Sequence, residues 1–464
     1  MEYEAVRSIA CRWTTTLTLI VFLATKNARA TCPSRCVCNS EDVVDCSDSG
    51  IADVPTNIPS TATTIDLSYN SISGLKKDDF ENASNWQSLD LSNNKISEIG
   101  NGTFEVFENL QFMNLSSNTI QGIPQETFAG LNGLKTLDLS FNPAMTLIEG
   151  ALQIMPSLTS ISLSGCPTAR SYKFSDIGTL QHLLLTQCEI HTLQPDNFRY
   201  LGELVLLDLS DNKITDFPSE TIGELRKLEV LHMDRNDVDL SKGKLLSQFS
   251  AITNLTLDEN EIRSIHQETL HDMRQLQQLS LVDNKLRSLP ESMFNGIPVT
   301  GSIDLDLAGN PLNCDCNLRW MTSWIRDNNV DDVVCDAPYA VQYKQLRSLK
   351  ADELACVPWE VPGQHIYHAV EGDDVTMICP LYTDEYTVVT WSTDCGEVVE
   401  IPSTIPFTPP YSIDENHSLV ISKVTKSLCE TYICEAQTSA GSLSTELTLN
   451  IKTASNDLHG VVVA

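Results

Sequence analysis

The chain has 464 residues and a formal charge of −32, because 62 acidic residues stand against 30 basic ones. Such a chain repels phosphate backbones and anionic lipid headgroups, which argues against nucleic acid or an anionic membrane surface as a partner. Hydrophobic residues make up 41% of the chain, which is enough for a packed core and argues against global disorder.

Residues 1–30 have the features of a secretory signal peptide. An apolar run extends from Leu17 to Ala24, and Ala28 and Ala30 place small residues where a signal peptidase cuts. Cleavage after Ala30 removes Cys11, one of 15 cysteines, and leaves an even number in an oxidising compartment. No later segment is apolar for the roughly 18 residues of a membrane helix. We therefore expect a secreted or extracellular chain, or a receptor ectodomain cut before its membrane helix.

A repeated motif covers the middle of the chain. The segments TTIDLSYNSI, QSLDLSNNKI, KTLDLSFNPA and VLLDLSDNKI begin at residues 63, 87, 135 and 205, and each fits the pattern LxxLxLxxN of leucine-rich repeats. Most motifs lie 24 residues apart. This spacing predicts eleven repeats within residues 60–310, whose last motif positions are Asn70, Asn94, Asn118, Asn142, Cys166, Cys188, Asn212, Asn236, Asn260, Asn284 and Asn310.

Each repeat is expected to form a short strand whose leucines, such as Leu137 and Leu139, point inward. The residue between these leucines then faces outward on a concave face, and the motif Asn bonds backbone groups that the turn leaves unpaired. One repeat cannot bury its own apolar side, but stacked repeats bury a continuous core. The sequence therefore predicts an α/β leucine-rich repeat solenoid with a parallel concave sheet.

Two cysteine clusters flank the repeats. The first is CPSRCVC from Cys32, and the second lies in NPLNCDCNLRWMTSW from Asn310. They resemble the N-terminal and C-terminal cysteine caps of extracellular leucine-rich repeat proteins, here residues 31–59 and 311–356. The resemblance implies the disulfides Cys32–Cys38, Cys36–Cys46, Cys314–Cys335 and Cys316–Cys356. A zinc site is the alternative, which an oxidising compartment disfavours.

Residues 357–453 resemble an immunoglobulin domain, followed by a tail at 454–464. The resemblance rests on Cys379, Trp391 twelve residues later, and Tyr432 two residues before Cys434. It implies an all-β sandwich with a Cys379–Cys434 bridge, Trp391 packed on that bridge and Tyr432 at the tyrosine corner. The C to C′ and E to F turns lie at the same end of such a sandwich. We therefore predict a second bridge, Cys395–Cys429.

Cys166 and Cys188 occupy motif Asn positions of adjacent repeats. Their Cα atoms should lie about 4.8 Å apart, within reach of a disulfide. Parallel stacked side chains give poor Cβ geometry for that bond, so we favour two buried free thiols, with a disulfide as the alternative.

No catalytic or cofactor motif is present. His266, Glu268 and His271 lie in HQETLH, where the histidines are five residues apart and do not form the HExxH zinc motif. The chain also lacks GxSxG, GxxxxGK[ST] and GxGxxG. We therefore expect no enzyme activity, no cofactor and no metal site.

Five sequons predict N-glycosylation, at Asn82, Asn101, Asn114, Asn254 and Asn416. Asn114 and Asn254 fall in outward strand positions of the third and ninth repeats. Glycans there would shield both ends of the concave face.

The candidate ligand site, called the predicted patch below, lies between these two sequons. It joins outward strand positions of repeats six to eight: His182, Leu184, Leu206, Asp208, Val230 and His232. Stacked apolar residues facing solvent mark binding sites, although single apolar residues in repeat strands are also tolerated. We expect Leu184→Glu or Leu206→Glu to abolish partner binding without unfolding. The acidity of the same face predicts a partner with a basic or apolar patch.

The whole mature chain resembles the extracellular leucine-rich repeat plus immunoglobulin family, which includes the LINGO, AMIGO and netrin-G ligand groups. The resemblance implies a protein-binding module that acts in cell-surface recognition, adhesion or ligand modulation, and it names no ligand. The alternative is a secreted innate-immune protein that binds microbial surface molecules.

Overall fold

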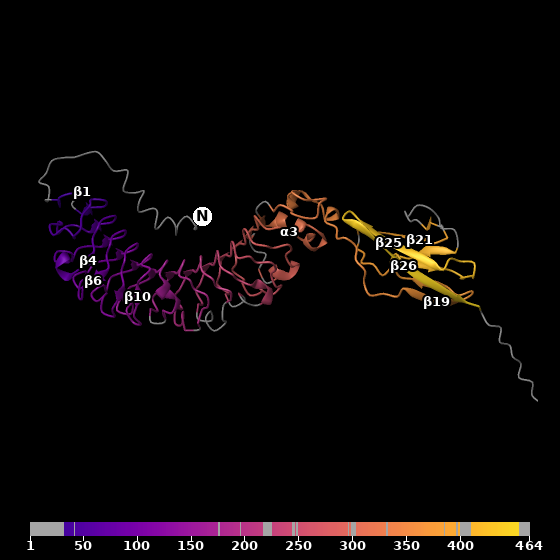
Figure 1. Cartoon of the computed structure of the whole chain (residues 1–464), viewed down its shortest axis with the longest axis horizontal. Helices are drawn as coiled ribbons and strands as arrows, with labels where there is room; N and C mark the ends of the chain where they lie inside the picture. Colours follow the sequence, from indigo (N-terminus) through magenta and orange to yellow (C-terminus); the bar gives the residue numbers. More distant parts are fainter. Residues whose placement is uncertain are drawn as a thin grey trace, which may run out of the picture. The chain divides into compact units, whose positions relative to one another are not determined.

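The computed structural model describes residues 32–453, except for 41, 175–176, 195, 217–224, 244–245, 247–248, 296, 298–302, 331–332, 385, 396–397 and 400–409. The expected signal peptide at 1–30 and the tail at 454–464 lie outside the described residues. The chain divides into two compact units, residues 1–172 and residues 173–464. Figure 1 traces both units, and each is described by itself below.

The first unit is built on a row of short strands. β1 (Val37–Ser40) pairs antiparallel with β2 (Val43–Asp45), which starts a parallel row. In every later strand of this row the middle residue is buried and its neighbours are partly exposed, so the apolar side chains stack in register. The row continues through β3 (Thr64–Asp66), β5 (Ser88–Asp90), β7 (Phe112–Asn114), β9 (Thr136–Asp138) and β11 (Ser160–Ser162).

The back half of the first unit closes its core with turns, 3-10 helices and two short strand pairs. The buried rings of Phe104 and Phe128, which come from adjacent repeats, stack with centroids 6.1 Å apart. These contacts make the core continuous behind the sheet. The elements here are β4 (Gly74–Leu75) with β6 (Glu98–Ile99), β8 (Gly122–Ile123) with β10 (Thr146–Leu147), η1 (Lys77–Phe80) and η2 (Pro167–Arg170).

The second unit begins with another parallel row of strands. Leu183, Leu207 and Leu231 stand side by side in register and are fully buried. The row runs through β12 (His182–Leu184), β13 (Leu206–Asp208), β14 (Val230–His232), β15 (Asn254–Thr256), β16 (Gln278–Ser280), β17 (Asp304–Asp306) and β18 (Asn329–Val330), with η3 (Leu240–Lys242) and η4 (Glu291–Phe294) behind it. Across both units, each of the eleven expected repeats contributes one strand, which confirms the leucine-rich repeat solenoid.

A ladder of buried asparagines joins neighbouring repeats. Nδ2 of Asn212 donates to the carbonyls of Leu185 and Leu209, both at 2.8 Å, and its Oδ1 accepts from the Ile190 amide at 3.0 Å. The preceding residue, Asp211, adopts a left-handed φ of 57°, which turns the chain so that the Asn side chain points inward. The ladder therefore pairs backbone groups that the turn leaves without partners.

Cysteine replaces asparagine in two steps of the ladder. Cys166 and Cys188 are buried thiols that form no disulfide, as predicted. The Cys166 thiol contacts the Leu139 carbonyl at 3.3 Å, and the Cys188 thiol contacts the Thr186 carbonyl at 3.4 Å. Burial raises the pKa of the Cys166 thiol to about 11, so this thiol stays protonated at neutral pH.

Disulfide caps close the two ends of the solenoid. The structure pairs Cys32 with Cys38, Cys36 with Cys46, Cys314 with Cys335 and Cys316 with Cys356, as the family resemblance implied. In the C-terminal cap, Trp324 stacks on Phe294 with ring centroids 4.5 Å apart. This stacking covers apolar surface behind the last repeat. The cap contains η5 (Cys316–Leu318), α3 (Met321–Asp327), η6 (Leu346–Ser348) and η7 (Ala351–Glu353).

The immunoglobulin domain is a two-sheet sandwich. One sheet has the strand order β19-β26-β25-β21-β22 and the other has the order β20-β24-β23. Cys379 pairs with Cys434, and the fully buried Trp391 belongs to the same core cluster. The predicted second bridge, Cys395–Cys429, is also present. The strands are β19 (Ile366–Val370), β20 (Val375–Met377), β21 (Val388–Thr393), β22 (Val398–Val399), β23 (Tyr411–Ile413), β24 (Leu419–Ile421), β25 (Thr431–Thr438) and β26 (Gly441–Lys452).

Candidate functional site

The candidate site is the outward side of the parallel strands in the second unit. Because side chains alternate along a strand, every second residue points to this concave side. Three rows result, and we call them the concave rows. They are His182, Leu206, Val230, Asn254, Gln278 and Asp304; Leu184, Asp208, His232, Thr256, Ser280 and Asp306; and Thr186, Ser210, Asp234, Asp258, Val282 and Ala308.

The predicted patch is less accessible than the sequence suggested. Leu206 is 5% exposed and His232 is 7% exposed, so the expectation that these two residues face solvent is wrong. Their neighbours in register cover them: Leu206 lies between residues of β12 and β14, and Nδ1 of His232 lies 3.0 Å from the Thr256 hydroxyl. The remaining members of the patch, His182, Leu184, Asp208 and Val230, are half-buried.

This burial changes how the patch can be tested. A charge at Leu206 would have to enter a packed site, so Leu206→Glu is expected to disturb folding as well as binding. Leu184 is half-buried, so a polar group introduced at this position can reach solvent more easily than one introduced at Leu206. Burial also lowers the pKa of His182, so its imidazole is neutral at pH 7.

Most concave aspartates hold the backbone of their own repeat. In the first unit, Oδ1 of Asp66 accepts from the Ser68 amide at 2.8 Å, and Asp90 and Asp138 make the equivalent bond. Asn114 makes the same bond to the Ser116 amide at 3.0 Å, which shows that an amide oxygen can replace the carboxylate. The Asp stripe of the repeat motif is therefore a local turn feature.

The second unit departs from this arrangement in repeats eight and nine. Asp234 and Asp258 stand where most of the other repeats carry Ser, and their carboxylates reach into the next repeat. Oδ1 of Asp234 accepts from the Asp258 amide at 3.0 Å. Oδ1 of Asp258 accepts from the Ser280 hydroxyl at 2.6 Å and from the Val282 amide at 2.8 Å. This change places carboxylates in the third concave row.

Asp258 lies close to two other carboxylates, those of Asp234 and Asp306. Burial raises the pKa of its carboxyl to about 6, and the nearby charges of Asp234 and Asp306 act in the same direction. The hydrogen bonds from Ser280 and Val282 only partly oppose this rise. Among the described residues, none donates a hydrogen bond to Oδ2 of Asp258. At neutral pH the ionised carboxylate therefore destabilises the fold.

We predict that Asp258→Asn stabilises the protein at neutral pH by about 1 kcal/mol, once solvent screening is allowed for. The folded-state pKa exceeds that of the unfolded chain, so the wild-type chain gains stability as pH falls from 7.5 through 6 toward 4. In thermal unfolding, Asp258→Asn should melt at a higher temperature than the wild-type chain at pH 7.5, and this difference should shrink below pH 5. Asp66→Asn is the matched control and should change little. An equal effect of Asp258→Asn at every pH would contradict the assignment.

Asn254 is a buried acceptor on the same face. Its side chain is 9% exposed, and all three residues of β15 are buried. Among the described residues, its Oδ1 has no hydrogen-bond partner. Val230 and Gln278 flank it in register. The expectation that a glycan at Asn254 shields the concave face therefore does not fit this structure, because the Asn254 side chain is enclosed by its neighbours.

We predict that glycans occupy the exposed sequons at Asn82, Asn101 and Asn416 and that Asn254 stays unmodified. A sugar at Asn254 would displace the packed residues around it, whereas the other three side chains extend into solvent. Asn114 is half-buried, and its Nδ2 donates to Oδ2 of Asp90 at 3.2 Å. Glycopeptide mass spectrometry of the chain expressed through a eukaryotic secretory pathway measures occupancy at each site. Substantial occupancy at Asn254 in folded protein would contradict the placement of β15.

The histidines of HQETLH do not converge on a site. Nδ1 of His266 accepts from the Glu268 amide at 3.2 Å, and Nδ1 of His271 lies 3.1 Å from Asp272 Oδ1. Within the searched, described part of the chain, neither histidine belongs to a group that could hold a metal ion.

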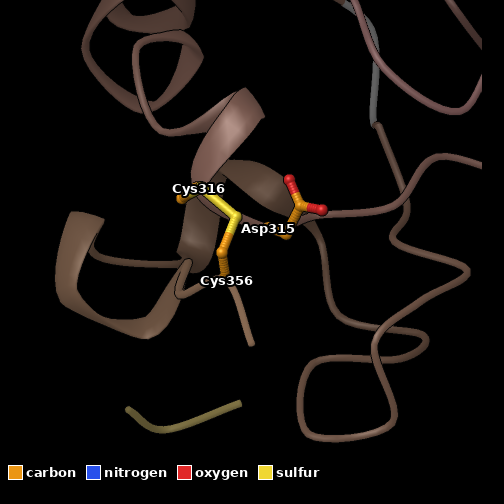
Figure 2. Close-up of side chains that lie close together, drawn as sticks. All are labelled: Asp315, Cys316 and Cys356. Atoms are coloured by element: carbon orange, nitrogen blue, oxygen red, sulfur yellow. A yellow bond between two sulfur atoms is a disulfide. The ribbon is translucent and has the colours of Figure 1, made fainter. Parts of the chain in front are cut away.

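Two clusters of sulfur and carboxylate atoms have the spacing of a metal site. One joins Asp315 with Cys316 and Cys356, and Figure 2 shows that the two sulfurs share a covalent bond. Disulfide sulfurs are not the thiolates that bind zinc. The Asp315 carboxylate caps η5 by accepting from the Asn317 amide at 2.8 Å. The other cluster, Asp394 with Cys395 and Cys429, also contains a disulfide.

A contact between the C-terminal cap and the immunoglobulin domain was not predicted. Arg319 donates from Nε and Nη2 to the Leu354 carbonyl, and Nη2 also lies 2.9 Å from Asp384 Oδ2. The guanidinium carbon lies 4.4 Å from the centroid of the Tyr386 ring. The charged side chains are only 18% and 14% exposed. No sequence signal could have revealed this pair, because Arg319 and Asp384 are 65 residues apart.

Two models of known protein families match the chain. The leucine-rich repeat model matches residues 60–120, 108–167, 178–238 and 250–312, which cover half of the chain. The chain belongs to the leucine-rich repeat family. The immunoglobulin I-set model matches residues 364–451, so the leucine-rich repeat chain also carries an I-set domain. This pair of domains is typical of extracellular, protein-binding families of adhesion type.

Relatives match only parts of this leucine-rich repeat protein. Adhesion G protein-coupled receptor A3 of Danio rerio is 31% identical over 144 residues, which are 28% of this chain and 11% of the receptor. Leucine-rich repeat and fibronectin type III domain-containing protein 1 of Danio rerio is 25% identical over 99 residues, which are 21% of this chain and 17% of that protein. The chain thus matches about a tenth of the receptor's length.

A solved structure shares the fold. It is a chain from an octameric complex of latrophilin 3, Unc5D and the leucine-rich repeats of FLRT2, with a TM-score of 0.56 and 24% identity. The match covers 70% of this chain and 99% of that one. In the described part of our chain, no helix is long and apolar enough to cross a membrane.

Proposed function

We propose that this protein is a non-enzymatic extracellular binding protein that recognises another extracellular protein through the concave face of its repeats. It would act in cell-surface recognition, adhesion or ligand modulation. One observation supports this proposal above the others: the concave rows of the second unit carry five aspartates and no lysine or arginine. Such a face attracts a partner with a basic patch and repels acidic ones.

The architecture supports the same proposal. Strands held in register by the asparagine ladder form a rigid sheet, and rigid side-chain arrays lose little entropy on binding. A surface of this kind suits a folded partner better than a small molecule, which needs an enclosing pocket. The half-buried Leu184 and Val230 add apolar area beside the acidic residues.

The relatives also support a protein partner. One is named as an adhesion receptor, and the solved complex joins a leucine-rich repeat protein with two other proteins. We extend this protein-binding role, without its particular partners, to the present chain. Secretion and membrane attachment through a following segment are both compatible with the proposed role.

The proposed function can be tested with an array of purified ectodomains, probed with the full chain as a tagged multimer. We expect at least one saturable interaction, weakened by raising the salt concentration because charged groups take part. Binding that does not weaken as the salt concentration rises would contradict the proposed attraction between the acidic concave face and a basic partner. No saturable binding to any ectodomain, together with binding to bacterial cells, would contradict the proposed role.

A further inference from the structure

An exposed Asn-Gly pair lies in the turn that precedes β9 in the first unit. The sequence contains three such pairs, which begin at Asn101, Asn132 and Asn295. Asn101 also begins a sequon, so a glycan is expected on its amide nitrogen, and the glycine that follows Asn295 lies outside the described residues. Asn132 is followed by glycine and leucine, which is no sequon. Its side chain therefore leaves the secretory pathway as an unmodified amide.

The corresponding turns before β5 and β7 are held by an asparagine side chain that the turn before β9 lacks. Nδ2 of Asn85 and Nδ2 of Asn109 each donate to a backbone carbonyl 25 residues earlier in the chain, at 3.0 and 2.9 Å. Gly133 occupies the equivalent position before β9 and has no side chain that could donate. A Cβ atom at Gly133 would lie 3.6 Å from the Glu108 carbonyl oxygen. The acceptor is therefore in place, and the donor that would hold this turn is missing.

Neither reactive group of this Asn-Gly pair is held by the fold. The Asn132 side chain is exposed, and within the described part of the chain neither its amide nor the backbone N–H of Gly133 makes a hydrogen bond. The backbone N–H of Asn132 itself donates to the Gly130 carbonyl at 2.8 Å, so the turn is formed without them. Because glycine carries no Cβ, the Gly133 nitrogen is also open to approach from either side.

We propose that Asn132 is a site of spontaneous deamidation through a cyclic imide with Gly133. The Gly133 nitrogen gives up its proton to base and attacks Cγ of Asn132. The bond from Cγ to Nδ2 then breaks, and the amide nitrogen takes a proton from water and leaves as ammonia. Water opens the imide in one of two ways. Cleavage at Cγ gives aspartate, and cleavage at the main-chain carbonyl carbon gives isoaspartate, in which the main chain runs through the side-chain carbon atoms.

The two products differ in their effect on the fold. Aspartate at position 132 only adds a charge to an exposed side chain. Isoaspartate adds a main-chain atom between Leu131 and Leu134, which are both fully buried and are joined by a bond of 3.2 Å from the Leu134 amide to the Leu131 carbonyl. The longer main chain either breaks this bond or displaces a buried leucine. The isoaspartate therefore destabilises the first unit as the protein ages, whereas the aspartate does not.

The chain offers a matched variant and an internal control. Gly133→Ala fits the turn, because the φ of Gly133 is not left-handed and the new Cβ would lie 3.4 Å from the Leu110 carbonyl and 3.6 Å from that of Glu108. Its methyl group hinders the attack of the backbone nitrogen on the Asn132 side chain. Asn109 is the internal control, because its Nδ2 is hydrogen-bonded and a leucine follows it. Asn132→Asp reproduces the aspartate product without lengthening the main chain.

The experiment incubates the full chain at 37 °C for four weeks and follows each asparagine by peptide mass spectrometry, with isoaspartate detected by enzymatic methylation of its free carboxylate. We expect Asn132 to deamidate at least tenfold faster than Asn109 and than Asn132 of Gly133→Ala, and faster at pH 8.5 than at pH 6.5, because base removes the attacking proton. The aged chain should melt below Asn132→Asp.

Equal rates at Asn132 and Asn109 would overturn the proposal, even if Gly133→Ala failed to fold. An unchanged rate in folded Gly133→Ala would overturn the role of Gly133. Equal melting temperatures of Asn132→Asp and an aged chain that contains isoaspartate would overturn the destabilising effect assigned to it.

Discussion

Asn118→Ala is expected to lower the free energy of unfolding by about 3 kcal/mol, because several buried backbone groups lose their partners together. Nδ2 of Asn118 donates to the carbonyls of Leu91 and Leu115, both at 3.0 Å, and its Oδ1 accepts from the Ile96 amide at 3.0 Å. The side chain is 4% exposed, so water cannot replace these bonds without opening the turn. Chemical denaturation followed by circular dichroism measures the loss.

Two matched substitutions show whether the ladder bonds are the cause. Asn132→Ala changes an exposed asparagine of the same unit and should cost less than about 0.5 kcal/mol. Asn118→Cys should cost less than Asn118→Ala, because the Cys166 thiol keeps a 3.3 Å contact with a carbonyl of the preceding repeat. Equal losses for Asn118→Ala and Asn132→Ala would show that the ladder does not stabilise the solenoid.

Arg319→Ala is expected to destabilise the contact between the C-terminal cap and the immunoglobulin domain by about 3 kcal/mol. The change leaves the mostly buried Asp384 carboxylate without its cation and removes both donors to the Leu354 carbonyl. It also removes the guanidinium from the Tyr386 ring. Limited proteolysis should then cut the segment between Cys356 and β19 at least tenfold faster, and calorimetry should show the sandwich unfolding separately.

The pH dependence of this contact follows from Asp384. Burial alone would raise its pKa, but hydrogen bonds from Thr387 and Arg319 outweigh burial and hold the pKa below its usual value. The stabilisation that the ionised Asp384 carboxylate contributes is therefore complete above the pKa of Asp384 in the unfolded chain. It is lost only as pH falls through the lower pKa of Asp384 in the folded chain. The effect of Arg319→Ala should be constant between pH 5 and 8. Arg319→Lys should restore only part of it, because an ammonium cannot reproduce the planar fork. Unchanged proteolysis of Arg319→Ala would contradict this account.

The features that the sequence predicted well are those fixed within one repeat or one cap. The LxxLxLxxN pattern determines which leucines turn inward, and the structure buries Leu137 and Leu139 completely. Ladder positions follow from the same spacing, which is why Cys166 could be recognised as a substitute for asparagine. The cap disulfides join cysteines at most 40 residues apart within compact segments.

The features that the sequence did not predict depend on neighbours in space. Whether Leu206 and His232 face solvent is decided by the residues beside them on adjacent strands, and the repeat pattern leaves those positions free to vary. The reach of Asp258 into the next repeat likewise depends on Ser280 and Val282. The Arg319–Asp384 pair joins two domains, so no periodicity within either domain predicts it.

The most direct test of the central claim compares one concave substitution with one on the back of the same unit. Leu184→Glu adds a negative charge to the concave rows, and Ser264→Glu adds the same charge at an exposed position outside them. Affinity for the first partner found on the ectodomain array is measured by surface plasmon resonance. We predict that Leu184→Glu weakens binding at least tenfold and that Ser264→Glu changes it less than twofold. Equal affinities for the two variants would contradict the claim that the concave face binds the partner.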